Sequence, residues 1–483
     1  MLRVKIIEAA VFQSIIKWVN RLITVITSVF LARILNPDDF GLLAIAMAIM
    51  GILEGFTTLG LNAGLIQNDE IVDDDYNVAW TYGYLLRGIF LFFLIFFISD
   101  WIALFYNTNE LSLVLKVLSI QQIFYAFSNI WLIEYYRKVE YRKDFIISIA
   151  SQFARILTVI PLAIYLKNIW ALVAGLLVKS FVGLILQYSI IQKRPRLNFD
   201  FNKFKKLFLF SIPIIGVQIV TIIKNSIDKI LLGKLLGVTQ LGYYQIASRF
   251  GFELPSEIKS VVSQVMFPAF SRIKNSKERL KTGFINVLTI TFIVSIPFCA
   301  FLFINTNNIV LVLLGDKWVD AIPAMRILVV AGFFQITHSI LNPLYKGFGK
   351  PKFEFYVSLL QSVLAIGFII ILTYEYGIVG TAYSMLLALF LPLFASWFFL
   401  KKILNIKFSE IVISLFYPII LGMIIYISSL YFNNNYNALP WKVLLVNIIN
   451  LFVITLISGY FLYKKVRLES LVLLVDGIKK LKR

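Results

Sequence analysis

Long apolar runs separated by short polar segments dominate the chain from end to end. A helix that crosses about 30 Å of hydrocarbon needs about 20 mainly apolar residues. Fourteen such segments can be placed: 14–35, 41–61, 78–98, 111–133, 145–166, 169–191, 207–231, 242–264, 282–303, 324–345, 353–374, 377–400, 409–431 and 441–463. The pattern therefore predicts an all-α integral membrane protein with about fourteen transmembrane helices.

The distribution of Lys and Arg predicts the orientation of these helices. With the N-terminus in the cytoplasm, the inside segments carry 30 basic residues and the outside loops only 3. Basic residues are retained in cytoplasmic loops, whereas Asp and Glu contribute little to this bias. Both termini, and the acidic loop Asp69–Asp75, are therefore predicted to be cytoplasmic.

An internal repeat predicts how the helices are grouped. Residues 31–46 align with residues 232–247 at an offset of 201 positions, and each copy holds a helix end, a turn and a helix-opening Gly. Because six crossings separate the copies, both face the same way, as in a parallel repeat. We expect an N-terminal six-helix lobe (1–191), a cytoplasmic basic linker (192–206), a C-terminal six-helix lobe (207–400), and two accessory helices with a basic cytoplasmic tail (401–483).

Composition narrows the function classes. The chain is 59% apolar and 15% charged, which argues against a water-soluble multidomain enzyme. The net charge of +20 lies mostly in short loops, where it suits anionic membrane lipids and not nucleic acid. One Cys, one His and the lack of a G-x-x-x-x-G-K-[ST] motif predict no zinc site, no nucleotide-binding loop and no cofactor.

Charged residues within the apolar segments are the candidate functional groups. Six basic residues are too deep to reach the interface easily: Arg21, Arg87, Arg155, Lys179, Lys224 and Arg249. Facing lipid, they would cost roughly 15–20 kcal/mol together. The acids at membrane depth, Glu54, Asp228, Glu253 and Glu257, are too few to neutralise them all. We therefore predict a net positive, substrate-binding cavity.

Helical spacing leaves a second interpretation open for some of these groups. Lys224 and Asp228, and likewise Arg249 and Glu253, are four positions apart, so each pair can form a structural ion pair on one helix. Glu54, Asp228 and Glu253 are then either pairing partners or ion-coupling carboxylates. The single histidine, His338, is expected to be packed or hydrogen-bonded and not a proton relay.

Several short motifs resemble those of a known family. They are the stretch from Leu31 to Gly41, Phe267-Pro-Ala-Phe-Ser-Arg272, Lys346-Gly-Phe-Gly-Lys-Pro-Lys352 and Tyr376-Gly-Ile-Val-Gly-Thr-Ala382. Their order resembles the Wzx-type lipid-linked oligosaccharide flippases, or polysaccharide transporters, of the MOP exporter superfamily, which also contains the MATE transporters.

The resemblance implies a MATE-like pair of lobes that opens alternately to each side of the bacterial inner membrane. It implies an undecaprenyl-pyrophosphate-linked oligosaccharide as substrate, and a polysaccharide polymerase and a chain-length regulator as partners. Related flippases rely on cations in helices 1 and 8, to which Arg21 and Arg249 correspond by helix.

Three other classes remain as alternatives. A multidrug or cation antiporter of the same fold would depend on Glu54 or Asp228 and tolerate loss of Arg21. A polymerase or ligase would need a larger outside loop than residues 304–323. A non-transporting scaffold would leave the buried cations without a purpose.

Overall fold

The computed structural model describes residues 2–57, 59–67, 70–258, 277–347, 351–435 and 439–461. Within these ranges the regular elements are helices, and no strand occurs. Ten helical stretches in these ranges are long and apolar enough to cross a membrane. The prediction of an all-α membrane protein is confirmed, whereas the count of fourteen and the six-plus-six layout stay predictions.

The chain divides into two compact units, Met1–Gly242 and Tyr243–Arg483. The division falls inside α10 (Phe201–Ala247), so the greater part of that helix packs with the first unit. The other helices of the first unit are α1 (Leu2–Ile34), α2 (Pro37–Thr57), α3 (Leu61–Gln67), α4 (Asp73–Trp80), η1 (Thr81–Leu86), α5 (Arg87–Tyr106), α6 (Asn109–Ala126), α7 (Leu132–Arg137), α8 (Arg142–Leu166) and α9 (Trp170–Ile190).

The second unit contains the end of α10 and a set of long helices with short elements between them. Its further elements are η2 (Ser248–Glu253), α11 (Leu254–Ser256), α13 (Lys277–Ile304), α14 (Thr306–Ile309), η3 (Val310–Leu314), η4 (Asp316–Ala321), α15 (Ile322–Gly347), α16 (Pro351–Phe390), α17 (Pro392–Leu404), α18 (Phe408–Asn435) and α19 (Pro440–Phe461). A positive φ at Gly377 separates the two helices predicted within 353–400.

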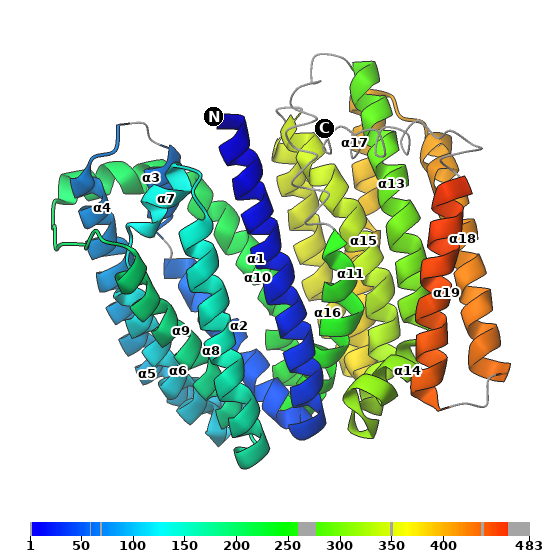
Figure 1. Ribbon diagram of the computed structural model, residues 1–483, viewed down its shortest axis with the longest axis horizontal. Helices are drawn as coiled ribbons and strands as arrows, with labels where there is room; N and C mark the ends of the chain where they lie inside the picture. Colours follow the sequence, from blue (N-terminus) through cyan, green and yellow to red (C-terminus); the bar gives the residue numbers. More distant parts are fainter. Residues whose placement is uncertain are drawn as a thin grey trace. The chain divides into compact units, whose positions relative to one another are not determined.

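In the first unit, long helices pack side by side and short ones cap one end. The pairs α5 and α6, α8 and α9, and α1 and α8 are in contact, and α3, α4 and α7 gather at one end of the unit (Figure 1). A buried apolar cluster holds that end together, with Tyr76 stacked on Trp131 at 4.6 Å between ring centroids. Next to this cluster, α2, α5, α6 and α10 surround a polar space inside the unit.

The basic stretch from Lys193 to Lys203, which runs into the first turn of α10, docks on the acidic segment at the start of α4. Lys203 Nζ lies 3.0 Å from Asp74 Oδ2, and Lys193 Nζ lies 3.4 Å from Asp73 Oδ1. The backbone N–H of Asn198 also donates to Thr81 Oγ1 at 3.0 Å. Two segments that were both predicted to be cytoplasmic are therefore neighbours.

The two copies of the sequence repeat meet in a reciprocal contact. A Cβ built on Gly41 would lie 1.9 Å from the carbonyl oxygen of Val238, and one on Gly242 would lie 1.9 Å from that of Pro37. Each residue of one contact is 201 positions from its counterpart in the other. The helices are interrupted at equivalent positions as well. Gly237, with φ of 82°, is the counterpart of Asn36, which lies between α1 and α2.

Three predicted boundaries differ from the structure. The second helix begins at Pro37 and not at Gly41, because Asp39 Oδ2 accepts from the N–H of Asn36 and so caps the helix start. The predicted helix 111–133 ends at Ala126, after which Asn129 Oδ1 accepts from the N–H of Trp131. The predicted outside loop 304–323 is largely helical, in α14, η3 and η4.

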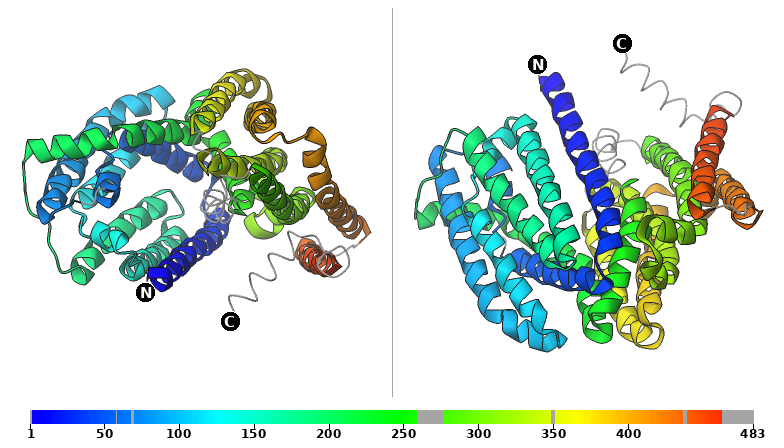
Figure 2. Two further views of the ribbon diagram at one scale, coloured as in Figure 1. Left: turned by 90° about the horizontal axis from the view of Figure 1, so that it is seen from above. Right: turned by 60° about the horizontal axis from the view of Figure 1, so that its bottom comes forward.

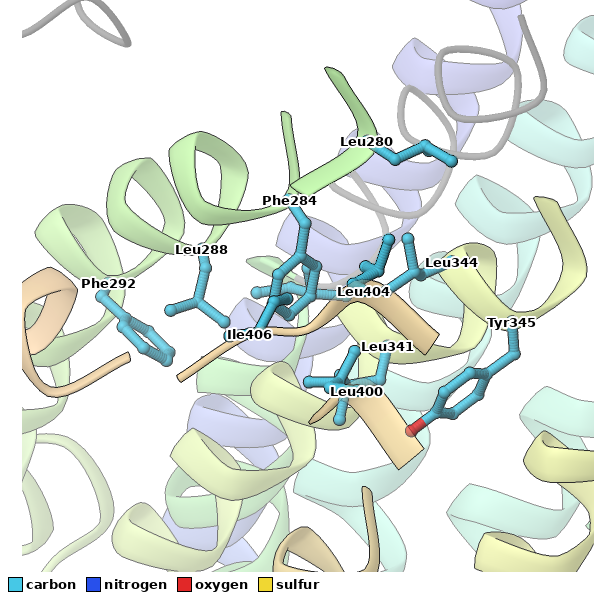
Figure 3. Packing of buried hydrophobic residues seen from close by; sticks show 11 residues of the cluster. Leu280, Phe284, Leu288, Phe292, Leu341, Leu344, Tyr345, Leu400, Leu404 and Ile406 are labelled. Carbon is cyan, nitrogen blue, oxygen red and sulfur yellow. The ribbon is translucent and has the colours of Figure 1, made fainter. Parts of the chain in front are cut away.

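A core of leucine and phenylalanine side chains holds α13, α15 and α17 together in the second unit. Leu280, Phe284 and Leu288 of α13 point toward Leu341 of α15 and Leu400 of α17 (Figure 3). Phe284 and Ile406 have no exposed surface. Ile411 and Leu415 of α18 pack against the same cluster, so it also holds that helix.

The C-terminal helices are attached to this core by asparagine side chains. Asn447 Nδ2 of α19 donates to Asn305 Oδ1 at 2.7 Å and to Asn433 Oδ1 of α18 at 2.9 Å. Figure 2 shows α18 and α19 side by side at the edge of the unit. One side of each of these helices is therefore buried against the rest of the unit through polar contacts.

Candidate functional site

A polar cavity of about 340 Å³ lies inside the first unit. Five elements supply its walls: the end of α2, the start of α3, the η1–α5 junction, the end of α6 and the first half of α10. The lining residues are Glu54, Leu59, Gly60, Leu61, Asn62, Gly83, Tyr84, Arg87, Gly88, Gln122, Tyr125, Ser128 and Gln218. Only Glu54 and Arg87 among them carry a formal charge at neutral pH. This space is called the Glu54–Arg87 pocket below.

Arg87 is held in place by groups from α2. Its Nη2 donates to the backbone oxygen of Glu54 at 3.0 Å, and its Nε donates to Thr57 Oγ1 at 3.3 Å. The Glu54 carboxylate attracts the guanidinium electrostatically. A cation and an acid that the sequence placed on separate helices are therefore brought together in one pocket.

Uncharged polar groups complete the pocket. Gln122 Nε2 donates to Glu54 Oε1 at 2.6 Å, and the Tyr84 hydroxyl donates to Asn62 Oδ1 at 3.2 Å. Gln122 is 2% exposed, so its amide is fixed by packing. The Glu54 carboxylate thus has an amide donor on one side and the guanidinium on the other.

Close helix packing explains why these groups meet. A Cβ on Gly88 would lie 2.6 Å from the Cβ of Ala126, so α5 and α6 approach closely just below Arg87. The preceding six residues form the π-helical turn η1, which shifts the register of the side chains that follow it. From these positions Tyr84 reaches Asn62 of α3, and Arg87 reaches Glu54 and Thr57 of α2.

Sequence reasoning missed most of the uncharged groups in this pocket. Asn62, Tyr84 and Gln122 were not among the candidate residues, although Gln121 and Gln122 are adjacent amides within the predicted membrane segment 111–133. Buried amides in membrane helices commonly bind neighbouring helices or ligands. That signal would have found Gln122, whereas Tyr84 is ordinary in an aromatic-rich chain.

Arg155 of α8 and Lys179 of α9 form a second group of candidates. Both side chains are half-buried, and they are close enough for their charges to repel. Gly175 accounts for the approach of the two helices, since a Cβ there would lie 1.9 Å from Val159 Cγ2 and 3.4 Å from Arg155 Cγ. An anion between the helices would relieve this repulsion.

Polar side chains of α1 and α8 are joined by a hydrogen bond. Asn20 Nδ2 of α1 donates to Ser148 Oγ of α8 at 3.1 Å. Arg21, the residue after Asn20, is half-buried. In α10, Lys224 is half-buried and Asp228 is 5% exposed. All three side chains take part in interactions within the described structure, so the ion-pair interpretation of Lys224 and Asp228 stays open.

Arg249 and Glu253 both lie in η2, a π-helical turn of the second unit. Their side chains are half-buried, whereas Ser248, Phe250 and Gly251 are buried. Arg249 and Glu253 each take part in an interaction of the folded chain, and the ion-pair interpretation of this pair stays open.

The single histidine is a packing residue, as predicted. His338 is 3% exposed, and its Nε2 is 2.8 Å from the backbone oxygen of Leu389. Among the residues that the structure describes, no group of three His, Cys, Asp or Glu side chains is suited to hold a metal ion.

Known proteins with related sequences and folds were then compared with the chain. The lipopolysaccharide biosynthesis protein WzxC of Escherichia coli (strain K12) is 23% identical over 425 residues, which cover 87% of this chain and 86% of WzxC. The lipid II flippase MurJ, in an inward closed conformation, has a TM-score of 0.76 and 19% identity over 95% of this chain and all of MurJ. A multidrug resistance MATE family transporter of the MOP superfamily, in an inward-facing conformation, has a TM-score of 0.65 and 14% identity over 83% of this chain and 99% of the transporter.

The fold is that of an all-helical, multi-pass membrane protein, and it is similar to the folds of these two transporters. A sequence profile of the polysaccharide biosynthesis protein family matches residues 30–323, which is more than half of the chain. The chain belongs to this family, as the resemblance to Wzx-type transporters predicted.

Proposed function

We propose that this protein flips lipid-linked oligosaccharide units across a bacterial inner membrane during surface polysaccharide biosynthesis. The observation that carries the proposal is the family match over residues 30–323. The relative WzxC is named for lipopolysaccharide biosynthesis, and the structural neighbour MurJ for flipping a lipid. The substrate inferred from this is an undecaprenyl-pyrophosphate-linked oligosaccharide.

The cationic residues within the helices bind the pyrophosphate in this proposal. Arg155 and Lys179 lie near one another with like charges, an arrangement that a bound anion stabilises. Guanidinium groups suit phosphate oxygens because they donate paired, charge-assisted hydrogen bonds. Arg21, Lys224 and Arg249 are assigned the same role, and the polyprenyl tail stays in lipid.

Transport is proposed to proceed by alternating access with both termini in the cytoplasm. A polysaccharide polymerase and a chain-length regulator would receive the unit on the far side. The carboxylates of Glu54, Asp228 and Glu253 are the candidates for coupling to an ion gradient. Arg87, which is bound to α2 next to Glu54, is the cation least suited to phosphate.

Deletion of the gene in its host tests the proposal. We expect radiolabelled lipid-linked repeat units to accumulate in the cytoplasmic leaflet and surface polysaccharide to disappear, with both restored by the intact gene. Normal surface polysaccharide without any accumulated intermediate would contradict the proposal.

A second candidate is an ion-coupled multidrug or cation antiporter. The acidic side chain of Glu54 in a polar pocket and the MATE-like fold favour it. Such a protein would extrude ethidium from loaded cells and lose this activity in Glu54→Gln or Asp228→Asn. The flippase proposal expects no ethidium extrusion by the intact protein or by either variant.

A further inference from the structure

The Glu54–Arg87 pocket has a different electrostatic character from the Arg155–Lys179 pair. Among the described residues that line it, one is an acid and one is a base, so the charges of these two side chains offset each other. A phosphate entering it would meet the guanidinium and the carboxylate together, and the carboxylate would repel it. The pocket is therefore poorly suited to the pyrophosphate end of an amphiphilic substrate.

Its hydrogen-bonding groups instead match a polyhydroxylated ligand. A sugar hydroxyl both donates and accepts, so it needs acceptors such as carboxylates and donors such as guanidinium and amide N–H groups. Glu54 offers acceptor oxygens, Arg87 offers donors, and Gln122 offers both, within one hydrogen-bonded set. These groups are already positioned by contacts with protein, so little ordering is needed on binding.

The pocket also presents aromatic surface beside these polar groups. Tyr84 and Tyr125 both line it, and Tyr125 is 46% exposed. An aromatic ring gives an apolar face against which the C–H face of a sugar ring can pack. The Tyr84 hydroxyl, which donates to Asn62, can still accept a hydrogen bond from a sugar hydroxyl. The volume of about 340 Å³ is near the lower end for small-ligand pockets, which suits a single ring-sized unit.

The pocket lies at the end of the first unit where a cytoplasmic substrate would arrive. Its walls include the start of α3, and α3, α4 and α7 gather at that end (Figure 1). The docked acidic and basic segments described above are at this end too. By the distribution of basic residues this end faces the cytoplasm.

We propose that the Glu54–Arg87 pocket binds one uncharged, hydroxylated sugar of the lipid-linked unit and so selects among units, separately from the cations that bind its pyrophosphate. This inference rests on the proposed function for the identity of the cargo. The binding itself needs no transport, so the two can be tested apart.

Saturation-transfer NMR on the purified full-length protein tests the binding. The probes are free hexoses, 6-deoxyhexoses and N-acetylhexosamines, with inorganic pyrophosphate as competitor. We expect at least one sugar to show a saturation-transfer signal from the protein. This signal should not decrease when pyrophosphate is added. Saturation of none of the sugars, or displacement of the bound sugar by pyrophosphate, would overturn the inference.

Two neighbouring tyrosines provide a matched pair of variants. Tyr84→Phe removes a hydroxyl that lines the pocket, whereas Tyr82→Phe removes a hydroxyl from the same π turn that donates to the Phe199 oxygen outside it. Loss of one hydrogen bond predicts about a three- to tenfold weaker affinity for the sugar in Tyr84→Phe. Tyr82→Phe should bind as the intact protein does, and equal weakening in both variants would contradict the inference.

Transport in proteoliposomes separates this inference from the proposed function. Two substrates with the same polyprenyl pyrophosphate are compared, one carrying the sugar found by NMR and the other its deoxy analogue. The intact protein should prefer the hydroxylated unit, and Tyr84→Phe should narrow this preference about three- to tenfold. Transport of neither substrate by the intact protein would refute the proposed function, whereas an unchanged preference in Tyr84→Phe would refute only the sugar pocket.

Discussion

Arg155 and Lys179 are two cations that lie half-buried on adjacent helices of a membrane protein. In water their repulsion would be weak, but it grows as the surroundings become less polar. Keeping such a pair therefore costs stability in the absence of ligand. That cost is consistent with a binding role, since an anion between them converts repulsion into two attractions.

Substitution of Lys179 by methionine tests this cost. We expect Lys179→Met to raise the free energy of unfolding by up to about 1 kcal/mol, because the repulsion with Arg155 is lost while the stem of the side chain is kept. Thermal unfolding of the purified protein without substrate is the measurement. Lys116→Met is the control. Lys116 Nζ pairs with Asp100 at 2.8 Å, so removing this charge should not raise the free energy of unfolding. A lower unfolding temperature for Lys179→Met than for Lys116→Met would contradict the account.

The sequence identified which charges are unusual but not which of them meet. A cation within an apolar run is visible from hydropathy alone, so Arg87 and Arg155 could be selected. The contacts of Arg87 with Glu54 and Thr57, and of Gln122 with Glu54, depend on packing between helices distant in sequence. Helical periodicity describes one helix at a time, so it could not predict them.

Pairs of helices are joined in this chain by contacts that leave no room for side chains. Gly41 and Gly242 each face a carbonyl oxygen of the other repeat copy, at positions related by the same offset of 201. Asp38 and Thr239, also 201 positions apart, are hydrogen-bonded beside them. The repeat seen in the sequence is therefore a packing unit in which each copy supplies the same surface.

Alanine at Gly41 tests whether this contact stabilises the fold. We expect Gly41→Ala to lower the free energy of unfolding by about 1–3 kcal/mol, because its Cβ would overlap backbone and not a movable side chain. Gly51→Ala, in the same helix, is the control, since nothing lies within 4 Å of its added Cβ. That change should stabilise by about 0.5–1 kcal/mol. Equal effects of the two substitutions on thermal unfolding would refute the contact.

In the second unit, helices are joined by a cluster of three asparagines, Asn305, Asn433 and Asn447. Asn447→Leu removes two hydrogen bonds that connect α19 to Asn305 and Asn433. We expect a loss of about 1 kcal/mol in unfolding free energy, since hydrogen bonds between membrane helices are individually modest. Leu456→Ala, at a position that is 71% exposed, is the control. In detergent it should lower the free energy of unfolding by less than Asn447→Leu does. A larger effect at Leu456 would contradict a structural role for the cluster.

Hydropathy located the helices well but could not give their local irregularities. Each predicted apolar segment overlaps one or more helices where the structure describes it, because length and apolarity are properties of the sequence. The π turns at η1 and η2, and the break after Ala126, follow from side-chain packing and from caps such as Asn129. These irregularities set the direction of Tyr84, Arg87 and Arg249, so the site was less predictable than the fold.

At the scale of the whole molecule, the predicted orientation can be checked with single cysteines. We expect Asp74→Cys to react with a membrane-impermeant maleimide only in inside-out vesicles, and Val319→Cys only in intact cells whose outer barrier has been removed. Both positions are exposed, and the native Cys299 is buried. Labelling of the two positions from the same side would contradict the predicted topology.

The central claim is that cations held within the helices move an anionic, lipid-linked oligosaccharide. The most direct test is translocation of a labelled polyprenyl-pyrophosphate oligosaccharide in proteoliposomes, comparing the intact protein with Arg249→Ala. The account predicts transport by the intact protein and its loss in the variant, at equal amounts of folded protein. Full transport by Arg249→Ala, or none by the intact protein, would contradict it.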